Sequence, residues 1–493
     1  MIPPAEAAAR ATFLLKYPEY ERTSGIDELR RSDYSRLDAL GQIYLDYTGG
    51  GLYGESQVRQ HADLLNRHVF GNPHSANPTS AATTDLVERT RRYVLQYFNA
   101  PPGEYVAVFT GNASGALKHV GESYPFADGG RYVLTVDNHN SVNGIREFAR
   151  AKGAAVEYAP LTVPDLRIDV PRLKALLDDA DRAKHNLFAF PAQSNFSGVK
   201  HPLDLVEHAH ANGWDVLLDA AAFVPTNRLD LTMVRPEFVS ISFYKMFGYP
   251  TGVGCLLIRS SVLPKLSRPW FAGGTVNFAT VRGRAHVLAP REAGFEDGTL
   301  DYLSIPAVEI GLRHLESIGI DAVQTRVGCL TGWLLERLLA LRHSNGRPMA
   351  RIYGPADTTR RGGTIALNLY DPQGHLLDYW RVDELASLQG ISLRTGCFCN
   401  PGAGETAEGL TDDDMRAALE AGTDITLGRF QEMMRHRGGK SAGAIRVSLG
   451  LMSNFADVYR FVAFAEGLRD QTRLTMGDVT FDIDACRLLR DGT

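Results

Sequence analysis

The sequence predicts an α/β fold, with a mostly parallel sheet in a large domain and a smaller α+β domain after it. Short apolar runs with the composition of buried strands alternate with segments long enough for crossover helices, which is typical of parallel sheets covered on both faces. The length of 493 residues is too great for one small core and suits two domains of unequal size. The expected strands are residues 105–110, 131–136, 186–191, 215–221, 238–242 and 254–259.

The alternation ends near residue 300, where a longer helical pattern replaces it. One face of this expected helix carries Ile305, Val308, Leu312 and Leu315. Two later strands are expected near 363–369 and 443–448, with helices between them. The polar stretch 403–444 has the composition of an exposed, partly helical insertion.

This change of pattern sets the expected domain boundaries. We expect residues 41–298 to form the large domain and residues 299–493 to form the small one. Segment 1–40 is expected to join the small domain.

The composition is that of an ordinary soluble globular protein, since 44% of the residues are hydrophobic and 22% are charged. A net charge of −5 gives no reason to expect nucleic acid or an anionic membrane as a partner. No apolar run reaches the roughly 20 residues that span a bilayer, and the N-terminus lacks the pattern of a secretion signal. Five cysteines do not make a disulfide framework, so we expect a reducing cytoplasm.

A lone lysine, Lys245, follows the expected strand 238–242 in the stretch SFYKMFGYPTGVG. In sheets of this kind, ligands bind beyond the carboxyl ends of the strands. Lys245 is either a surface lysine that happens to follow a strand or a Schiff-base lysine with a lowered pKa. Asp219 ends another expected strand, and a carboxylate there can keep a pyridine nitrogen protonated. The Asp and Lys pair is what pyridoxal phosphate (PLP) requires, so the pair indicates a PLP site.

Three short stretches offer donors for a phosphate group. The stretch FTGNASGALK runs from a strand into a helix, where Ala113 and Ser114 can present backbone N–H groups and a hydroxyl. A plain strand-to-helix turn uses the same residue types. Ser242 and Thr275 are further candidate donors.

The stretch RTGCFCNPGAG contains two cysteines, Cys397 and Cys399, in a loop rich in glycine and proline. Their spacing is not that of a metal site, and no metal is expected. Both thiols could be idle, or one could be a nucleophile, which requires part of it to be thiolate. Arg394 precedes the pair and Arg446 lies on an expected strand, where a guanidinium suits a bidentate grip on a carboxylate.

Together these stretches resemble the fold type I PLP enzymes of the class V aminotransferase and cysteine desulfurase group. Within that group the chain is most similar to the N-terminal, desulfurase-like part of molybdenum cofactor sulfurases. The resemblance implies a seven-stranded type of sheet and covers roughly residues 40–470. The matching stretches, in order, are YLDYTGGGLY, GNPHSANPTS, DNHNSVNGIREFA, FPAQSNFSGVKHP, LDAAAFV, SFYKMFGYPTGVG, FEDGTLDYLSIPA, RTGCFCNPGA and GAIRVSLG.

The resemblance also implies a role for each matched residue. Lys245 would bind PLP covalently and move protons, Asp219 would pair with the pyridinium, and His139, or Asn138 beside it, would stack on the ring. Cys399 would attack the substrate sulfur and carry it as a persulfide, because Cys397 falls where desulfurases often have histidine. The phosphate would be bound by Ala113, Ser114, Ser242 and, from a second subunit, Thr275. Asn195 would contact the substrate or the cofactor. Arg446, with support from Arg394, would bind the substrate carboxylate.

The sequence departs from the desulfurase pattern in two respects. Ala222 stands where many desulfurases have glutamine, and Tyr244 where they have histidine; both residues match the cofactor-sulfurase pattern. After GAIRVSLG only about 45 residues follow, too few for the C-terminal domain of those sulfurases. We therefore expect a different sulfur acceptor, whose identity the sequence does not give.

Three functions are open at this point. The first is a cysteine desulfurase-like sulfurtransferase that converts L-cysteine to alanine and needs Cys399. The second is a PLP-dependent C–S lyase or aminotransferase acting on another amino acid in a biosynthetic pathway, which can do without Cys399. The third is a binding or scaffold protein without catalysis, which the presence of Lys245, Asp219 and the phosphate donors disfavours. A homodimer is expected, because this fold usually builds its site at a dimer interface.

Overall fold

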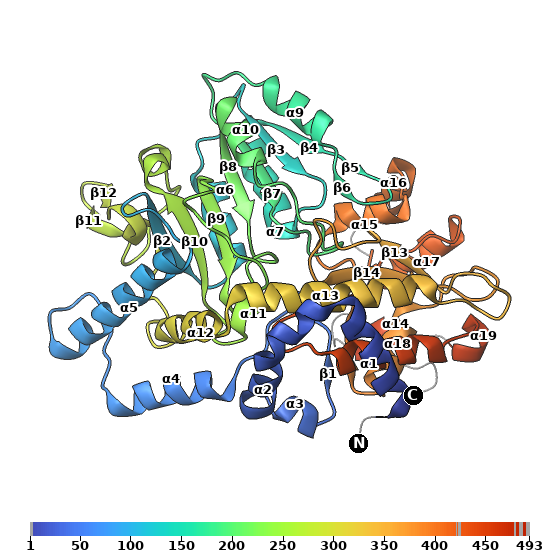
Figure 1. Ribbon diagram of the computed structural model, residues 1–493. Helices are drawn as coiled ribbons and strands as arrows, with labels where there is room; N and C mark the ends of the chain where they lie inside the picture. Colours follow the sequence, from blue (N-terminus) through green and yellow to red (C-terminus); the bar gives the residue numbers. More distant parts are fainter. Residues whose placement is uncertain (1–2, 421, 423–424, 478–479, 483–486, 490–493) are drawn as a thin grey trace.

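The computed structural model describes residues 3–420, 422, 425–477, 480–482 and 487–489 (Figure 1). Positions 421, 423 and 424 of the expected insertion, and positions 478–479, 483–486 and 490–493 of the expected C-terminal domain, lie outside the described residues. No helix of the described part is long and apolar enough to cross a membrane.

A seven-stranded sheet occupies the centre of the large N-terminal region (Figure 1). Its strand order is β2-β10-β9-β8-β7-β3-β4, and all neighbours are parallel except that β10 runs antiparallel to both β2 and β9. The strands are β2 (Tyr105–Thr110), β3 (Arg131–Thr135), β4 (Ala155–Ala159), β7 (Asn186–Pro191), β8 (Trp214–Asp219), β9 (Phe238–Ser242) and β10 (Gly254–Arg259). The predicted α/β class with a mostly parallel sheet is therefore confirmed.

All six expected strands of the sheet are present, with ends within two residues of the predicted ones. The sequence analysis missed β4. This strand lies at the edge of the sheet, and most of its residues are partly or fully exposed. It therefore lacks the continuous apolar run that marks strands buried on both faces.

Both faces of the sheet are covered, because alternate residues of each strand enter different hydrophobic clusters. Val106 and Val108 of β2 pack on one face, and Ala107 and Phe109 pack on the other. The first face is covered by α6 (Ala113–Ser123) and α8 (Ile145–Ala151). The second face is covered by α5 (Pro78–Tyr97), α10 (Leu205–Ala211) and α12 (Ile305–Ile318).

The C-terminal region contains a four-stranded antiparallel sheet in the order β13-β14-β17-β16. Strands β14 and β17 correspond to the two predicted later strands, which are confirmed. Its elements are α13 (Ile320–Ala340), β13 (Ala350–Tyr353), β14 (Thr364–Leu369), α14 (Tyr379–Ser387), β16 (Arg394–Gly396), β17 (Ala444–Ser448) and α18 (Phe455–Gly467).

The N-terminal helices pack against this C-terminal region, at the lower right in Figure 1. They are α1 (Pro4–Lys16), the 3-10 helix η1 (Pro18–Thr23) and α2 (Ser24–Asp33). The ring of Phe13 lies 4.9 Å from that of Phe455, between centroids. Arg326 of α13 is fully buried and pairs with Asp27 of α2.

The polar stretch 403–444 is largely helical where it is described. It contains most of α15 (Pro401–Glu408), then α16 (Asp412–Glu420) and α17 (Leu427–His436). Ala403 and Ala407 of α15 are buried, whereas α16 is mostly exposed. The first helix of this stretch is therefore part of the packed structure and directly follows the cysteine loop.

Helix α12, predicted from its apolar face, presses on the short helix α11 (Phe243–Phe247) that carries Lys245. The contact leaves no room for a side chain at Gly311, where an added Cβ would lie 2.1 Å from the ring of Phe247. The geometry of the Lys245 turn therefore depends on a glycine in a helix far along the chain.

We predict that Gly311→Ala destabilises the protein by about 1–3 kcal/mol, because the added methyl displaces Phe247 from a filled core. Gly328→Ala in α13 is the matched control, since no atom lies within 4 Å of its added Cβ. That control should be neutral or stabilising by about 0.5–1 kcal/mol, as alanine is the better helix former. Urea unfolding midpoints of the two variants test this, and equal midpoints would contradict it.

Candidate active site

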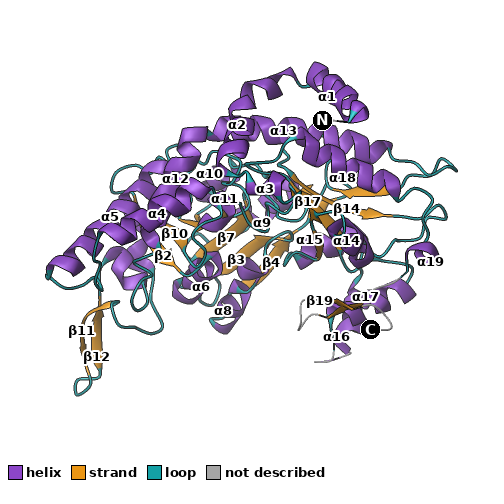
Figure 2. Cartoon of the chain, turned by 90° about the horizontal axis from the view of Figure 1, so that it is seen from below, coloured by secondary structure: helices purple, strands orange, loops and turns teal. Residues whose placement is uncertain are grey.

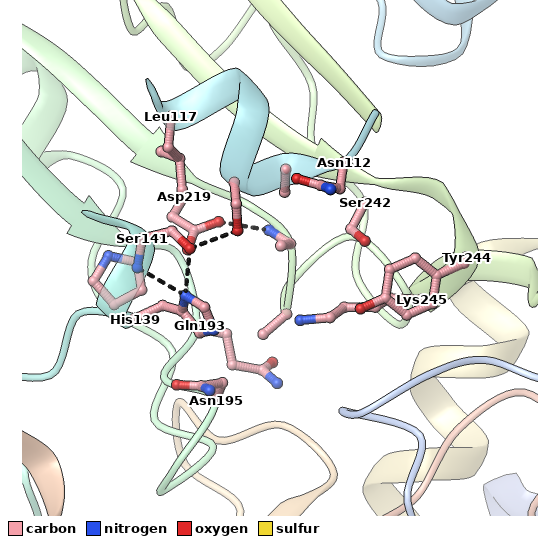
Figure 3. Close-up of a pocket in the computed structure, with 15 residues that line it drawn as sticks. Asn112, Leu117, His139, Ser141, Gln193, Asn195, Asp219, Ser242, Tyr244 and Lys245 are labelled. Atoms are coloured by element: carbon pink, nitrogen blue, oxygen red, sulfur yellow. Dashed lines mark hydrogen bonds between the residues drawn. The ribbon is translucent and has the colours of Figure 1, made fainter. Parts of the chain in front are cut away.

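A cavity of about 90 Å³ opens where the carboxyl ends of the central parallel strands meet. Its walls come from the segments that follow β2, β3, β7, β8 and β9 (Figure 3). Of the predicted site residues, it brings together Ala113, Ser114, His139, Asn195, Asp219, Ser242 and Lys245. Ala222 and Tyr244, the two residues that depart from the desulfurase pattern, also line the cavity.

Lys245 points its amine toward the middle of this cavity (Figure 3). Burial lowers the pKa of Lys245; the Asp219 carboxylate opposes this effect, and the Arg446 guanidinium adds to it. In the described structure the amine has no hydrogen-bond or ion-pair partner. A lysine in these surroundings has a larger neutral fraction than a surface lysine, and the neutral amine is the nucleophile.

Asp219 ends β8 with one carboxylate oxygen held and the other available. Its Oδ1 accepts hydrogen bonds from the Ser240 hydroxyl at 2.7 Å and from the Ala221 backbone N–H at 3.1 Å. Oδ2 has no protein donor among the described residues. A carboxylate fixed through one oxygen can offer the other to a cationic N–H group in the cavity.

His139 begins the short helix α7 (Asn140–Asn143) on the other side of the cavity. Its Nδ1 accepts the backbone N–H of Ser141 at 3.1 Å, so the neutral ring carries its proton on Nε2. Burial lowers the pKa of His139, and the cations of Lys245 and Arg446 add to this effect, whereas Asp219 opposes it. The ring is therefore neutral at neutral pH.

The phosphate donors gather at the start of α6. Asn112 caps this helix by accepting the N–H of Gly115 at 2.9 Å, so the first N–H groups, at Ala113 and Ser114, are left for a ligand. The Ser114 hydroxyl lies 2.6 Å from that of Ser141. Ser242, at the end of β9, lines the same cavity.

These residues fit PLP. The unpartnered amine of Lys245 suits the aldehyde, the free oxygen of Asp219 suits a protonated pyridine nitrogen, and the start of α6 suits the phosphate. The flat ring of His139 lines the same space. No cluster of His, Cys, Asp or Glu in the described residues could hold a metal ion.

The cysteine loop lies beside the cavity and is tied to it by hydrogen bonds. Asn195 donates its amide to Phe398 O at 2.8 Å and accepts from Asn400 at 2.8 Å. Asn400 also donates to Asp137 O at 2.7 Å, and the Asn140 N–H donates to Cys399 O at 2.7 Å. The loop is thus fixed to the segments before and after His139.

The two cysteines of this loop differ in their surroundings. Cys399 is exposed, whereas Cys397 is partly buried, and burial raises the pKa of the Cys397 thiol. Phe398 and Cys399 both have positive φ angles, of 56° and 54°, which non-glycine residues rarely adopt. The hydrogen bonds of Asn195 and Asn400 hold this strained backbone in place.

The two predicted carboxylate-binding arginines do not line the cavity. Arg446 is buried, donates to Asn195 O at 3.1 Å and to Asp46 at 2.9 Å, and lies over the Phe398 ring. Arg394 is half-exposed and binds the same Asp46 carboxylate at 2.7 Å. Both arginines are nevertheless close enough to lower the pKa of Lys245.

Thr275, the remaining predicted phosphate donor, also lies outside the cavity. It precedes the hairpin of β11 (Val276–Thr280) and β12 (Ala285–Leu288), and its hydroxyl bonds within its own turn to Ala272. Sequence reasoning missed Gln193, Ser141, Asn112 and Asp46. Gln193 follows the strand end at 191, as Asp219 ends its own strand, and that position was a usable signal. Asp46 gave none, because its partners lie 348 and 400 residues away in the chain.

Comparisons with known proteins agree with this geometry. Residues 43–461 match the aminotransferase class-V family. The chain is 37% identical to molybdenum cofactor sulfurase of Arabidopsis thaliana, over 92% of this chain and 60% of that protein. It is 35% identical to the human molybdenum cofactor sulfurase, over 89% and 50%.

The fold is also that of a solved structure. The apo structure of cysteine desulfurase from Thermococcus onnurineus NA1 superposes with a TM-score of 0.74 and 21% identity, covering 90% of this chain and 97% of that one. The chain thus has the fold of a cysteine desulfurase but spans little more than half the length of the curated relatives it matches.

We predict that Asn400→Ala loosens the cysteine loop. Asn400 is buried and caps α15, and its loss removes the cap, worth about 1 kcal/mol, and leaves buried partners unsatisfied at about 1–3 kcal/mol more. Asn77→Ala is the matched control, because Asn77 caps α5 in the same Asn-Pro setting but is exposed. Amide hydrogen exchange of residues 396–402 should accelerate only in Asn400→Ala. Unchanged exchange there would contradict the proposed fixing of the loop.

Proposed function

The chain belongs to the class-V aminotransferase family, and from that premise we propose that it is a PLP-dependent cysteine desulfurase-like sulfurtransferase. Its proposed substrate is L-cysteine, its product is L-alanine, and the sulfur passes through Cys399 to an acceptor. The observation that carries this proposal is the cysteine loop beside the cavity that Lys245 and Asp219 line. The loop is hydrogen-bonded to both segments flanking His139, through Asp137 O and the Asn140 N–H. An enzyme without sulfur chemistry has no need to fix an exposed thiol there.

Each of the predicted residues in and beside the cavity has a role in this proposal. Lys245 would hold the cofactor and would accept the α-proton of the substrate, which its lowered pKa permits. Asp219 would hold the ring nitrogen, His139 would lie against the ring, and Ala113, Ser114 and Ser242 would bind the phosphate. When bound, PLP supplies an electron sink for the carbanion at the substrate α-carbon. Asn195 orders the loop, and Arg446, supported by Arg394, binds the substrate carboxylate.

Sulfur transfer needs a thiolate in line with the carbon–sulfur bond of the substrate. The Cys399 thiolate attacks the substrate sulfur, a sulfur–sulfur bond forms, and the carbon–sulfur bond breaks with its electron pair left on the β-carbon. Protonation of that carbon gives alanine, so that L-cysteine and the Cys399 thiol become L-alanine and a Cys399 persulfide. Cys397 is the poorer nucleophile, because burial raises its pKa and lowers its thiolate fraction.

The sulfur acceptor depends on what the relatives have beyond the matched region. The relatives are molybdenum cofactor sulfurases, and this chain covers 50–60% of their length. We therefore propose the desulfurase half-reaction and leave the acceptor open. A reducing compartment such as the cytoplasm suits a site whose Cys399 must be a free thiol, as it is here.

We predict that the protein loaded with PLP converts L-cysteine to alanine and gains one sulfur atom on the peptide that contains Cys399. Cys399→Ser should remove the added sulfur and slow alanine formation by at least about a hundredfold, because the nucleophile is lost. Cys397→Ser is the matched control and should retain both. Alanine is measured by chromatography and the persulfide by peptide mass spectrometry.

Two other results would contradict this proposal and favour a different activity. Pyruvate and sulfide from L-cysteine in place of alanine would indicate a C–S lyase that eliminates sulfide. Full turnover of another amino acid by Cys399→Ser would indicate an aminotransferase or lyase that does not use the thiol.

We also propose a homodimer, supported by the β11–β12 hairpin. This hairpin projects away from the body of the chain (Figure 2) and carries exposed apolar side chains. Val281 is 95% exposed and Phe278 is 60% exposed. Apolar side chains exposed together on a projecting hairpin are typical of a surface that another protein covers. The hairpin directly follows Thr275, for which the resemblance implies a phosphate contact in the second subunit; within one chain Thr275 is buried and its hydroxyl bonds to Ala272.

We predict that the protein sediments at twice the mass of one chain and that Phe278→Asp raises the dimer dissociation constant by at least about tenfold, because a charge is placed in an apolar contact. Leu15→Asp is the control, since Leu15 is equally apolar, is 86% exposed and lies on α1. Analytical ultracentrifugation measures both. A monomeric wild-type protein would refute the dimer.

A further inference from the structure

One carboxylate, that of Asp46, holds both arginines of the proposed substrate site. Its Oδ2 accepts from Arg394 Nε at 2.9 Å and Nη2 at 2.7 Å, and its Oδ1 accepts from Arg446 Nη2 at 2.9 Å. Asp46 is buried, so these charge-assisted bonds lie in a medium that strengthens them. The orientation of Arg446 is therefore set by a residue from the other end of the chain.

The turn that follows Asp46 is shaped around this pair. The N–H groups of Gly49 and Gly50 both donate to Asp46 O, at 3.0 and 3.1 Å. An added Cβ at Gly49 would lie 2.5 Å from Asp46 Oδ2 and 2.8 Å from Arg394 Nη2, so the pair lies directly over this glycine. An added Cβ at Gly50 would make only ordinary contacts, with the Tyr244 ring at 3.6 Å and the Tyr44 hydroxyl at 3.9 Å.

The arrangement leaves a buried arginine donor without a partner and a net positive charge among three side chains. Arg446 Nε is buried and has no hydrogen-bond partner among the described residues, whereas both Nη atoms are engaged. Within this group of three side chains, the two guanidinium charges and the Asp46 carboxylate sum to a single positive charge; Asp383, whose pKa burial raises to about 6, interacts with the Arg394 side of the group. One carboxylate of a bound amino acid balances that charge, and a second carboxylate would meet the negative charge of Asp46.

We propose that Asp46 is a positioning residue that fixes Arg446 for the substrate carboxylate and restricts the site to amino acids with one carboxylate. This inference rests on the proposed function only in that Arg446 receives an amino-acid carboxylate. It adds a selectivity rule: L-alanine and L-cysteine fit the charge of the site, and L-aspartate does not.

The test measures binding as well as turnover, in the full chain loaded with PLP. Dissociation constants for L-alanine and L-aspartate are measured by titration calorimetry, together with KM and kcat for L-cysteine. Asp46→Asn removes the charge while keeping the shape, Gly49→Ala keeps the charge but displaces the carboxylate, and Gly50→Ala is the matched control in the same turn.

We expect Asp46→Asn to lower the ratio of the L-aspartate to the L-alanine dissociation constant by at least about tenfold, because the repelling charge is gone. Gly49→Ala should raise the L-alanine dissociation constant and KM by at least about tenfold, with kcat within about threefold, because Arg446 binds the carboxylate but does no chemistry. Gly50→Ala should leave each value within about twofold, since its added methyl makes only ordinary contacts.

An unchanged ratio in Asp46→Asn would overturn the selectivity rule, and an unchanged KM and L-alanine affinity in Gly49→Ala would overturn the positioning role. Failure of the proposed function is a separate result. A wild-type protein that binds L-alanine but forms no alanine from L-cysteine is not a desulfurase, and the two binding measurements still decide the role of Asp46.

Discussion

The site depends on one lysine amine held in a narrow cavity at the end of a parallel sheet. Burial lowers the pKa of Lys245, and the nearest opposing charge is Asp219, one strand away in the sheet. Packing around the lysine turn maintains this burial from two sides. Gly311 of α12 lies against Phe247, and Gly51 lies against the Lys245 carbonyl, where an added Cβ would stand 2.9 Å from the oxygen. Both contacts require glycine, so the reactivity of the amine is a property of the packing around it.

The second constraint is a series of polar contacts. It joins the turn after Asp46, strand β17 with Arg446, the segment after β7 with Asn195, and the cysteine loop. Asp46 binds Arg446, Arg446 binds Asn195 O, and the side chain of Asn195 binds both Phe398 O and Asn400. The proposed sites of substrate binding and sulfur transfer belong to one network, because the arginine proposed for the carboxylate and the loop of Cys399 share Asn195. A substitution at either end of this network, at Asp46 or at Asn400, should therefore alter the hydrogen bonds at the other end.

The sequence was most informative where function depends on local pattern. Strands buried on both faces appear as apolar runs, and Lys245 and Asp219 follow from their positions at strand ends. The edge strand β4 was missed, because exposed edge residues carry no apolar run. Asp46 could not be found, since nothing near it in sequence marks a residue whose partners lie hundreds of positions away. The displacement of Arg446 and Arg394 from the cavity wall likewise follows from this contact and not from any local motif.

The measurement that tests the account most directly is chemical trapping of the cofactor. The protein loaded with PLP is reduced with borohydride, digested, and mapped by mass spectrometry, with Lys245→Ala and Lys200→Ala compared in parallel. Lys200 is the matched control, because burial lowers its pKa as well but it lies outside the cavity. The account predicts a reduced PLP adduct on the peptide that contains Lys245, which persists in Lys200→Ala and is absent from Lys245→Ala. An adduct on another lysine, or none in the wild-type protein, would contradict it.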